Sequence, residues 1–392
     1  MQPTRRAEIP VLAFSAANAL GTDADRILDA LRAGRTGLAP CPLEIPFPTA
    51  CGMLPGALDP LPARLRAWDT RLCRVALLSL EGVRPALLAA VRRHGPERVA
   101  LVVGTSTGGI LETEAAFLAW AESGRIPAEY DFDRQHALHG LLEVLRAVTG
   151  ASGPAWIVST ACSSSGKVFA TGRRLLLAGL ADAVLVGGVD TLCQTTLRGF
   201  GCLQALSPSP CRPFNAQRDG TSIGEGGAFA LLAREGEGPV RLLGVGESCD
   251  AHHMSHPHPE GLGARLAMEE ALARAGLPAA EVDHVNAHGT GTPANDLPEA
   301  RAISAVLGDL VPVASTKGYT GHLLGAAGAT EAVLAALSIV HGFVPRSLGA
   351  EPVDPGVKIA VCRATAARPV RTVLSNSFAF GGSNVSLLLG AA

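Results

Sequence analysis

The chain has 392 residues, of which 47% are hydrophobic, 17% are charged and 4% are aromatic. This composition excludes a disordered protein and provides a large core, built as two domains or as one two-lobed unit. A formal net charge of -2 argues against bulk affinity for nucleic acid or anionic membranes, and no apolar run reaches the roughly 18 residues of a membrane span.

The nine cysteines are an odd number and include no Cys-x-x-Cys pair. This pattern argues against a disulfide framework and against a zinc site, and it is typical of a reducing compartment. The N-terminus has two arginines but no clean apolar region with a cleavage site, so no signal peptide is expected. The sequence therefore predicts a cytoplasmic protein.

The first half of the chain predicts alternating strands and helices. Strands are expected over residues 9–14, 98–103, 155–158, 183–188 and 224–232. Helices are expected over about 23–33, 69–91, 112–122, 133–149 and 167–177, with an irregular loop over 38–62. This order favours a parallel sheet covered by helices.

The composition changes at Glu235–Pro239, which predicts a boundary between an N-terminal half (1–239) and a C-terminal half (240–392). Strands are then expected over 240–245, 282–286, 311–315, 372–376 and 385–389, and helices over 262–275, 297–307 and 326–339. Asp296 and Glu299 have the spacing of a capping box. The similar order of elements in the two halves suggests a duplicated fold.

Cys162 lies where a predicted strand gives way to a helix. Unpaired N–H groups and the positive end of the helix dipole favour a thiolate there, and the thiolate is the nucleophilic form of cysteine. The small neighbouring residues leave room for a substrate. For this residue taken alone, a buried structural cysteine is the alternative.

Three further segments place polar, reactive residues directly after strand-like runs, and they contain His288, the pair Lys317 and His322, and Phe380. Strand ends are where sites collect in open α/β sheets. Each residue alone is compatible with a structural role. Together with Cys162, the two histidines and the lysine predict one nucleophilic site.

The motifs TACSSS, NAHGTGT, STKGYTGH and SNSFAFGGSN, which contain these residues, resemble those of the β-ketoacyl-acyl carrier protein synthases of the I/II type. The resemblance extends along nearly the whole chain. It implies an α/β protein with the thiolase fold, in which two similar halves form a five-layered arrangement. It also implies decarboxylative condensation of malonyl-carrier protein with an acyl chain held on Cys162, in fatty-acid-like, aryl-polyene or polyketide elongation.

The resemblance assigns roles to individual residues. Neutral His288 and His322 would stabilise the negative charge that decarboxylation builds on the malonyl thioester, and Lys317 would keep the second histidine neutral and oriented. The N–H groups of Cys162 and Phe380 would form a second oxyanion hole. The gating loop contains Phe378, Phe380 and Gly381, and the predicted substrate-binding residues are Thr107, Thr290, Thr292 and Asn384.

No cofactor or metal of the protein's own is expected, because the phosphopantetheine arm arrives on the carrier protein. The expected partners are an acyl carrier protein and a second subunit, in a homodimer or in a heterodimer with a chain-length-factor-like protein. The candidate docking residues for the acidic carrier are Arg64, Arg66, Arg71 and Arg74, although a basic cluster is often only a solvated face.

Other functions fit the residues less well. A catalytically idle chain-length-factor-like subunit is the alternative, but such subunits lack the nucleophilic cysteine. His322 argues against the Cys-His-Cys set of thiolases and the Cys-His-Asn set of synthases that use coenzyme A primers. The histidine-rich segment 252–258 has irregular spacing and no acidic partners, which argues against a metal site.

Two positions depart from the family pattern. Ala379 replaces a glycine in the gating loop, and Thr107 occupies a position where an apolar residue often lines the acyl pocket. Together with the motifs TACSSS, VDTLCQ and DAHHMS, these residues favour the aryl-polyene or polyketide-like subgroup.

Overall fold

A computed structural model describes residues 8–392. Eleven strands form one continuous sheet in the order β13-β11-β10-β15-β16-β9-β1-β8-β6-β4-β5. The N-terminal half supplies β1 (Ile9–Ala17), β4 (Val99–Gly104), β5 (Ala155–Val158), β6 (Ala183–Asp190) and β8 (Gly226–Ala233). The C-terminal half supplies β9 (Val240–Cys249), β10 (His284–Asn286), β11 (Pro312–Ala314), β13 (Ala360–Val361), β15 (Thr372–Phe378) and β16 (Ser383–Ala391).

The two halves of the sheet have the same topology. In the N-terminal half, β5, β4 and β6 are parallel, and β8 runs antiparallel to both β6 and β1. In the C-terminal half, β11, β10 and β15 are parallel, and β16 runs antiparallel to both β15 and β9. The halves meet where β1 pairs with β9, and residues 234–239 connect β8 to β9.

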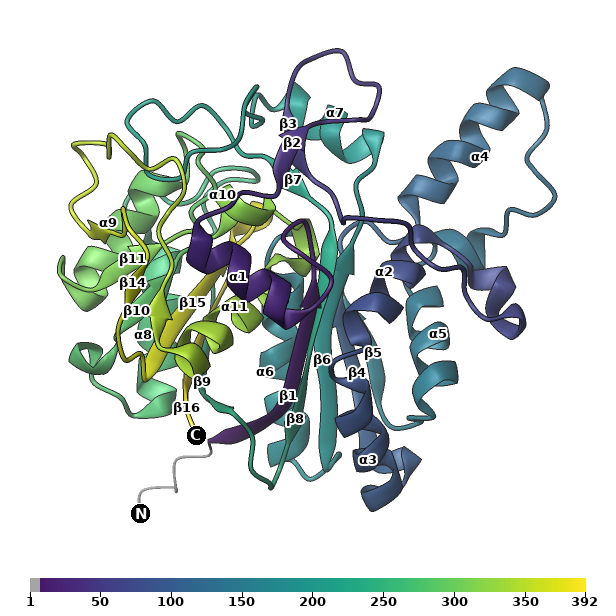
Figure 1. The fold of residues 1–392 in the computed structure, drawn as a ribbon, viewed down its shortest axis with the longest axis horizontal. Coiled ribbons are helices and arrows are strands. Elements are labelled where there is room, and N and C mark those ends of the chain that lie inside the picture. The colour runs from purple at the N-terminus through teal and green to yellow at the C-terminus, as the bar shows by residue number, and fades with distance from the viewer. Residues whose placement is uncertain (1–7) are drawn as a thin grey trace.

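The helices form three layers around these two halves of the sheet (Figure 1). The outer layer of the N-terminal half contains α2 (Arg71–Leu80), α3 (Arg84–His94) and α5 (Gly140–Thr149). The middle layer contains α6 (Ser164–Leu177) and α11 (Ala327–His341), which contact each other and both halves of the sheet. The outer layer of the C-terminal half contains α8 (Leu262–Ala275) and α9 (Asp296–Leu307). The five-layered arrangement is therefore confirmed.

α1 (Ala24–Ala33) packs against the hydrophobic cluster that contains the middle-layer helices, through Ile27, Leu28 and Leu31. The remaining helices are α4 (Ile110–Ser123), α7 (Gln194–Cys202) and the short α10 (Lys317–Thr320). Figure 1 shows α4 projecting away from the body of the protein. Among residues 8–392, one helical segment, Leu324–His341, is long and apolar enough to cross a bilayer, but 89% of it is buried because it contains the middle-layer helix α11.

Several predicted boundaries were wrong for local reasons. The helix expected over 69–91 is interrupted after Leu80, and α3 begins with Pro85 in its first turn, where proline is favoured because it lacks an N–H. The helix expected over 133–149 starts as a π-helical turn, Phe132–His136, and α5 begins only at Gly140. The loop 38–62 contains β2 (Leu38–Pro40) and β3 (Ala50–Gly52), and β3 pairs with β7 (Ile223–Gly224).

Candidate active site

Cys162 lies in a sharp turn between β5 and α6. The preceding residue, Ala161, has a φ of 50°, which is strained for a residue with a Cβ. The Ser164 hydroxyl donates to the Ala161 carbonyl at 2.6 Å and accepts from the Thr160 N–H at 2.9 Å. Two local hydrogen bonds therefore hold the turn that carries the cysteine in front of the helix N-terminus.

A cavity of about 280 Å³ brings most of the predicted site residues together. Its walls include Cys162, His288, His322, Phe378, Phe380, Thr290, Thr292 and Asn384. The Thr290 and Thr292 hydroxyls lie 2.8 Å apart, and the Asn384 amide donates to Asp250 at 3.1 Å. Segments that are far apart in the sequence thus converge on the thiol.

Burial raises the pKa of the Cys162 thiol to about 11, although the Lys317 ammonium and the Phe380 and Cys162 N–H groups lower it. The helix N-terminus favours a thiolate, as the sequence indicates, but desolvation outweighs the dipole and the nearby charge, so the folded chain favours the thiol form of Cys162.

The His288 and His322 rings are nearly perpendicular, with centroids 5.3 Å apart. Burial and the Lys317 ammonium hold both pKa values well below 6.5, and His322 lowers that of His288 further. Both imidazoles are therefore neutral at physiological pH. Each can donate one hydrogen bond and accept another.

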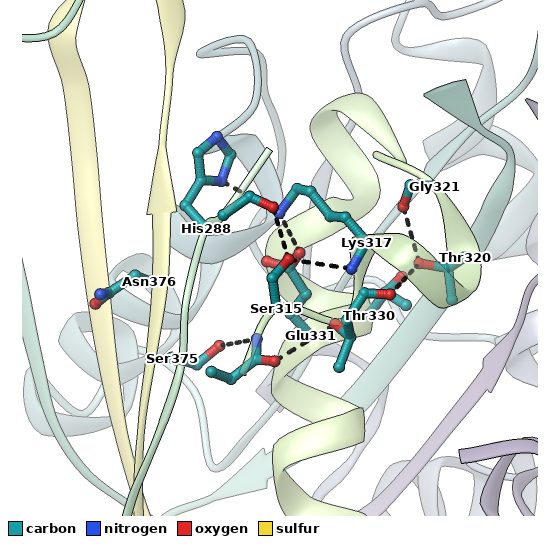
Figure 2. Close-up of polar contacts among 12 residues, drawn as sticks. His288, Ser315, Lys317, Thr320, Gly321, Thr330, Glu331, Ser375 and Asn376 are labelled. Atoms are coloured by element: carbon teal, nitrogen blue, oxygen red, sulfur yellow. Dashed lines mark hydrogen bonds and ion pairs between the residues drawn. The ribbon is translucent and has the colours of Figure 1, made fainter. Parts of the chain in front are cut away.

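Lys317 is fully buried behind this pair, and Figure 2 shows its ammonium between His288 and Glu331. Lys317 Nζ lies 3.4 Å from His288 Nδ1 and forms an ion pair with Glu331. Because an ammonium only donates, His288 Nδ1 must accept and its proton must be on Nε2. Sequence reasoning paired Lys317 with His322; the ring it contacts is that of His288, although its charge lowers the pKa of both.

Two buried carboxylates, those of Glu299 and Asp296, bind backbone N–H groups of the loop that carries His288 and of a neighbouring segment. Glu299 on α9 accepts from the His288 and Gly289 N–H groups, both at 2.7 Å. Asp296 accepts from Phe214 N–H at 2.7 Å and from Gly291 N–H at 3.1 Å. The predicted capping box was therefore wrong, because these carboxylates bind neighbouring loops and Asn295 occupies the cap position of α9.

The predicted gating loop follows β15. The Phe380 ring, 37% exposed, stacks on Phe200 of α7 at a centroid distance of 5.6 Å. Gly381 has a φ of 80°, a conformation that favours glycine, and its N–H donates to the Met254 carbonyl at 2.7 Å. Ala379 has an extended backbone (φ -121°), so its methyl group causes no backbone strain.

Three of the predicted substrate-binding and docking residues have side chains engaged by acidic residues of the chain itself. The Thr107 hydroxyl donates to the buried carboxylate of Asp190 at 2.7 Å, and Thr107 does not line the cavity. Arg71 forms an ion pair with the fully buried Glu225, and Arg74 pairs with Asp69 at 2.7 Å. Of the candidate docking arginines, Arg64 and Arg66 remain exposed.

Comparison with known proteins places these motifs in a family. Residues 76–237 match the family description "Beta-ketoacyl synthase, N-terminal domain", and residues 240–351 match "Beta-ketoacyl synthase, C-terminal domain". The chain belongs to the β-ketoacyl synthases. It is a condensing acyltransferase of fatty-acid-like, aryl-polyene or polyketide elongation, and the idle-subunit alternative is not favoured.

Relatives of this β-ketoacyl synthase cover three quarters or more of its length. Nodulation protein E of Rhizobium meliloti is 33% identical over 94% of this chain and 95% of its own. A 3-oxoacyl-[acyl-carrier-protein] synthase 2 of Vibrio harveyi is 34% identical over 76% of both chains. The ketosynthase ApeO of Xenorhabdus doucetiae, solved in complex with its chain length factor ApeC, is 38% identical over 100% of both chains, with a TM-score of 0.92.

Sequence reasoning missed the buried acids of this synthase. Burial raises the pKa of Glu331 to about 7, even though the Lys317 ammonium opposes the shift. Glu331 is the only charged residue between Ala327 and Val340, and a single carboxylate in an otherwise apolar helix could have indicated a buried cationic partner. No comparable local signal marks Asp190, whose partners come from distant segments.

A Lys317→Met variant of the synthase should shift the pH dependence of CO2 release from malonyl-carrier protein. Without the ammonium, the pKa values of His288 and His322 rise towards 6.5. Because an imidazolium would pair with the malonyl carboxylate and hold it in the ground state, CO2 release should then decline at a higher pH than in the wild type. The variant should also lose about 3–5 kcal/mol of stability, because Glu331 is left buried and unpaired. Rates of CO2 release between pH 5.5 and 8, and denaturant unfolding, measure the two effects.

A double variant, Lys317→Met with Glu331→Gln, separates these effects. It removes both buried charges, so it should recover most of the lost stability. It still lacks the cation that depresses the histidine pKa values, so the altered pH dependence should persist. A wild-type pH profile in the double variant would show that Lys317 does not control the histidines.

Proposed function

We propose that Cys162, His288 and His322 are the catalytic residues of this condensing enzyme, with Lys317 as the residue that holds the histidines neutral. The observation that carries this proposal is that the thiol and both neutral imidazoles line one cavity. The gating phenylalanines Phe378 and Phe380 line the same cavity.

Acyl transfer comes first. The Cys162 sulfur attacks the acyl thioester of the carrier, and its proton leaves with the displaced carrier thiol. The Cys162 and Phe380 N–H groups stabilise the tetrahedral oxyanion, in agreement with their effect on the pKa of the thiol. The product is an acyl thioester on Cys162.

Condensation follows when malonyl-carrier protein replaces the free carrier. The C–C bond to the malonyl carboxylate breaks, CO2 leaves, and negative charge develops on the thioester oxygen. Hydrogen bonds from neutral His288 and His322 stabilise that charge. The carbanion then attacks the Cys162 thioester, forms the new C–C bond and releases the sulfur, which regains a proton.

The test is mass spectrometry of the intact protein after incubation with acyl-carrier protein, followed by peptide mapping. We expect a single acyl adduct on the peptide that contains Cys162, and loss of that adduct with CO2 release when malonyl-carrier protein is added. An adduct on another cysteine, or no adduct with any primer length, would contradict the proposal.

We also propose that the carrier approaches across Arg64 and Arg66, and that Thr290, Thr292 and Asn384 bind its phosphopantetheine arm. A double charge reversal, Arg64→Glu with Arg66→Glu, should raise the KM for acyl-carrier protein about tenfold and leave kcat unchanged, because rim charges control encounter. Arg93→Glu, an exposed arginine on α3, is the matched control. An unchanged KM at low salt would exclude these two arginines.

The second subunit is proposed to be a chain-length-factor-like protein of the same fold, because the relative ApeO is solved with such a partner. The surface that would receive it contains exposed apolar side chains on or near α4 and on the edge strand β5: Phe117, Leu118, Trp120, Ile126, Phe132 and Trp156. Phe117 and Trp120 are in contact, with ring centroids 5.5 Å apart, and exposed apolar side chains that gather in this way mark a protein interface.

The nine cysteines are all free, which supports placing the assembly in the cytoplasm.

Trp120→Glu should weaken association with that subunit by about 100-fold. A tryptophan that becomes buried in a complex is often an interface anchor, and a charge in its place would be desolvated there. Leu310→Glu is the control, since Leu310 is 90% exposed and lies far along the chain from α4. Co-purification and light scattering measure the complex. If Trp120→Glu disrupts only self-association, the partner is a second copy of this chain.

A further inference from the structure

Asp190, the last residue of β6, is a fully buried carboxylate at the meeting point of the two halves. It accepts from the Thr105 hydroxyl (2.7 Å), Ser106 N–H (2.9 Å), Thr107 N–H (2.8 Å) and hydroxyl (2.7 Å), and Ala326 N–H (3.0 Å). Burial raises the pKa of Asp190, and the hydrogen bonds from Thr105, Thr107 and Ser106 lower it. A buried carboxylate is costly, so this arrangement calls for a reason beyond packing.

On one side, Asp190 reaches the turn that carries the nucleophile. Ser106, whose N–H binds the carboxylate, donates its hydroxyl to the Ala161 carbonyl at 3.1 Å. Ala161 is the strained residue directly before Cys162. A two-bond path therefore connects Asp190 to the position of the thiol.

On the other side, Asp190 reaches the segment that carries His322. Ala326 ends a short 3-10 helix, Leu324–Ala326, that begins two residues after His322. Gly325, next to Ala326, packs directly against Ser106 and Asp190. A Cβ added to Gly325 would lie only 2.5 Å from Ser106 Oγ and 2.7 Å from Asp190 Oδ2. The same carboxylate thus binds one segment leading to the thiol and one following the histidine.

We propose that Asp190 is a positioning residue that fixes Cys162 and His322 relative to each other for the C–C bond-forming step. This inference rests on the catalytic assignments proposed above. A carbanion generated beside His322 must lie within bonding distance of the acyl carbon on Cys162, and a misplacement of about 1 Å can cost about 100-fold in rate. The thiol and the imidazole come from different halves of the protein, and Asp190 hydrogen-bonds to both halves.

The test compares Asp190→Asn with the wild type in three measurements: acylation of Cys162, CO2 release from malonyl-carrier protein, and formation of β-ketoacyl product. The asparagine amide cannot accept from all five donors, so at least one segment should shift. Condensation should fall about 100-fold, and it should fall more than either partial reaction. The amount of CO2 released per product should therefore rise.

Ser15→Ala is the control for a purely structural effect. Ser15 is buried and donates to the Ser79 carbonyl at 2.6 Å, between β1 and α2 and outside the cavity. Its loss should lower stability and leave the ratio of CO2 to product unchanged, because a smaller folded fraction reduces all three rates equally. An unchanged ratio in Asp190→Asn would overturn the proposal.

Ser106→Ala keeps the proposal testable if Asp190→Asn does not fold. It removes only the hydroxyl that links the network to Ala161, so the ratio should rise in the same direction by a smaller factor, and a wild-type ratio would overturn the proposal. Acylation of the wild-type protein distinguishes failure of the Asp190 proposal from failure of the catalytic assignment. If Cys162 is not the acyl carrier, the wild-type protein itself will show no adduct there.

Discussion

A Cys162→Ala variant will carry no acyl group and will extend no chain. The variant loses the atom that forms the thioester, and no other group in the cavity replaces it, since the histidines are neutral donors to the malonyl oxygen in the proposed scheme. The rate of β-ketoacyl product formation should fall by about 10⁴-fold or more, in line with the loss of a nucleophile in other covalent enzymes. Product formation is measured with acyl- and malonyl-carrier protein, and the adduct by intact mass.

The control for this variant is Cys362→Ala, which removes a partly buried thiol that does not line the cavity. It should retain wild-type acylation and extension. Cys162→Ala should remain folded, because one small side chain replaces another and the free energy of unfolding should fall by only about 1 kcal/mol. Extension by Cys162→Ala at the wild-type rate would contradict the assignment of the nucleophile.

The sequence was sufficient to predict the α/β class, the duplicated order of elements and the convergence of Cys162, His288 and His322. These predictions succeeded because they depend on local signals: apolar runs for strands, helical periodicity and glycine-rich motifs after strand ends. The helix boundary after Leu80 was missed because one proline, Pro85, starts a new helix within a periodic segment.

The electrostatics of the site could not be predicted from spacing. The helix N-terminus before Ser164 favours a thiolate at Cys162, but the pKa depends on how much solvent the folded chain removes, and burial dominates. In the same way, Lys317 precedes His322 by five residues and yet contacts His288, because the strands that precede them, β10 and β11, are parallel neighbours that end at one edge of the sheet.

The buried acids show a second limit of sequence reasoning. Asp296 and Glu299 have the spacing of a capping box, but α9 packs beside the loop after β10, and both carboxylates bind N–H groups of other segments. Tertiary partners therefore replaced the local ones that the pattern predicts. The Asp190 network arises in the same way, from contacts between the two halves, and the Glu331 ion pair joins α11 to the segment after β11 within the C-terminal half.

His322→Ala should separate the two half-reactions of the synthase. Removing one of two preorganised donors should slow CO2 release about 10²–10³-fold, because the charge on the malonyl thioester oxygen then has only His288 as a partner. Acylation of Cys162 should be retained to a much greater degree, since in the proposed scheme the Cys162 and Phe380 N–H groups stabilise its oxyanion. Stopped-flow CO2 release and timed intact-mass measurements follow the two steps.

His284→Gln is the matched control for this separation. His284 is also a buried histidine whose pKa burial lowers, to about 4, but its Nδ1 lies 3.0 Å from the Pro312 carbonyl and it does not line the cavity. Its replacement should change stability without changing the balance between acylation and decarboxylation. If His322→Ala slowed acylation and CO2 release equally, His322 would serve both steps, and the proposed division of roles between the backbone N–H groups and the histidines would be wrong.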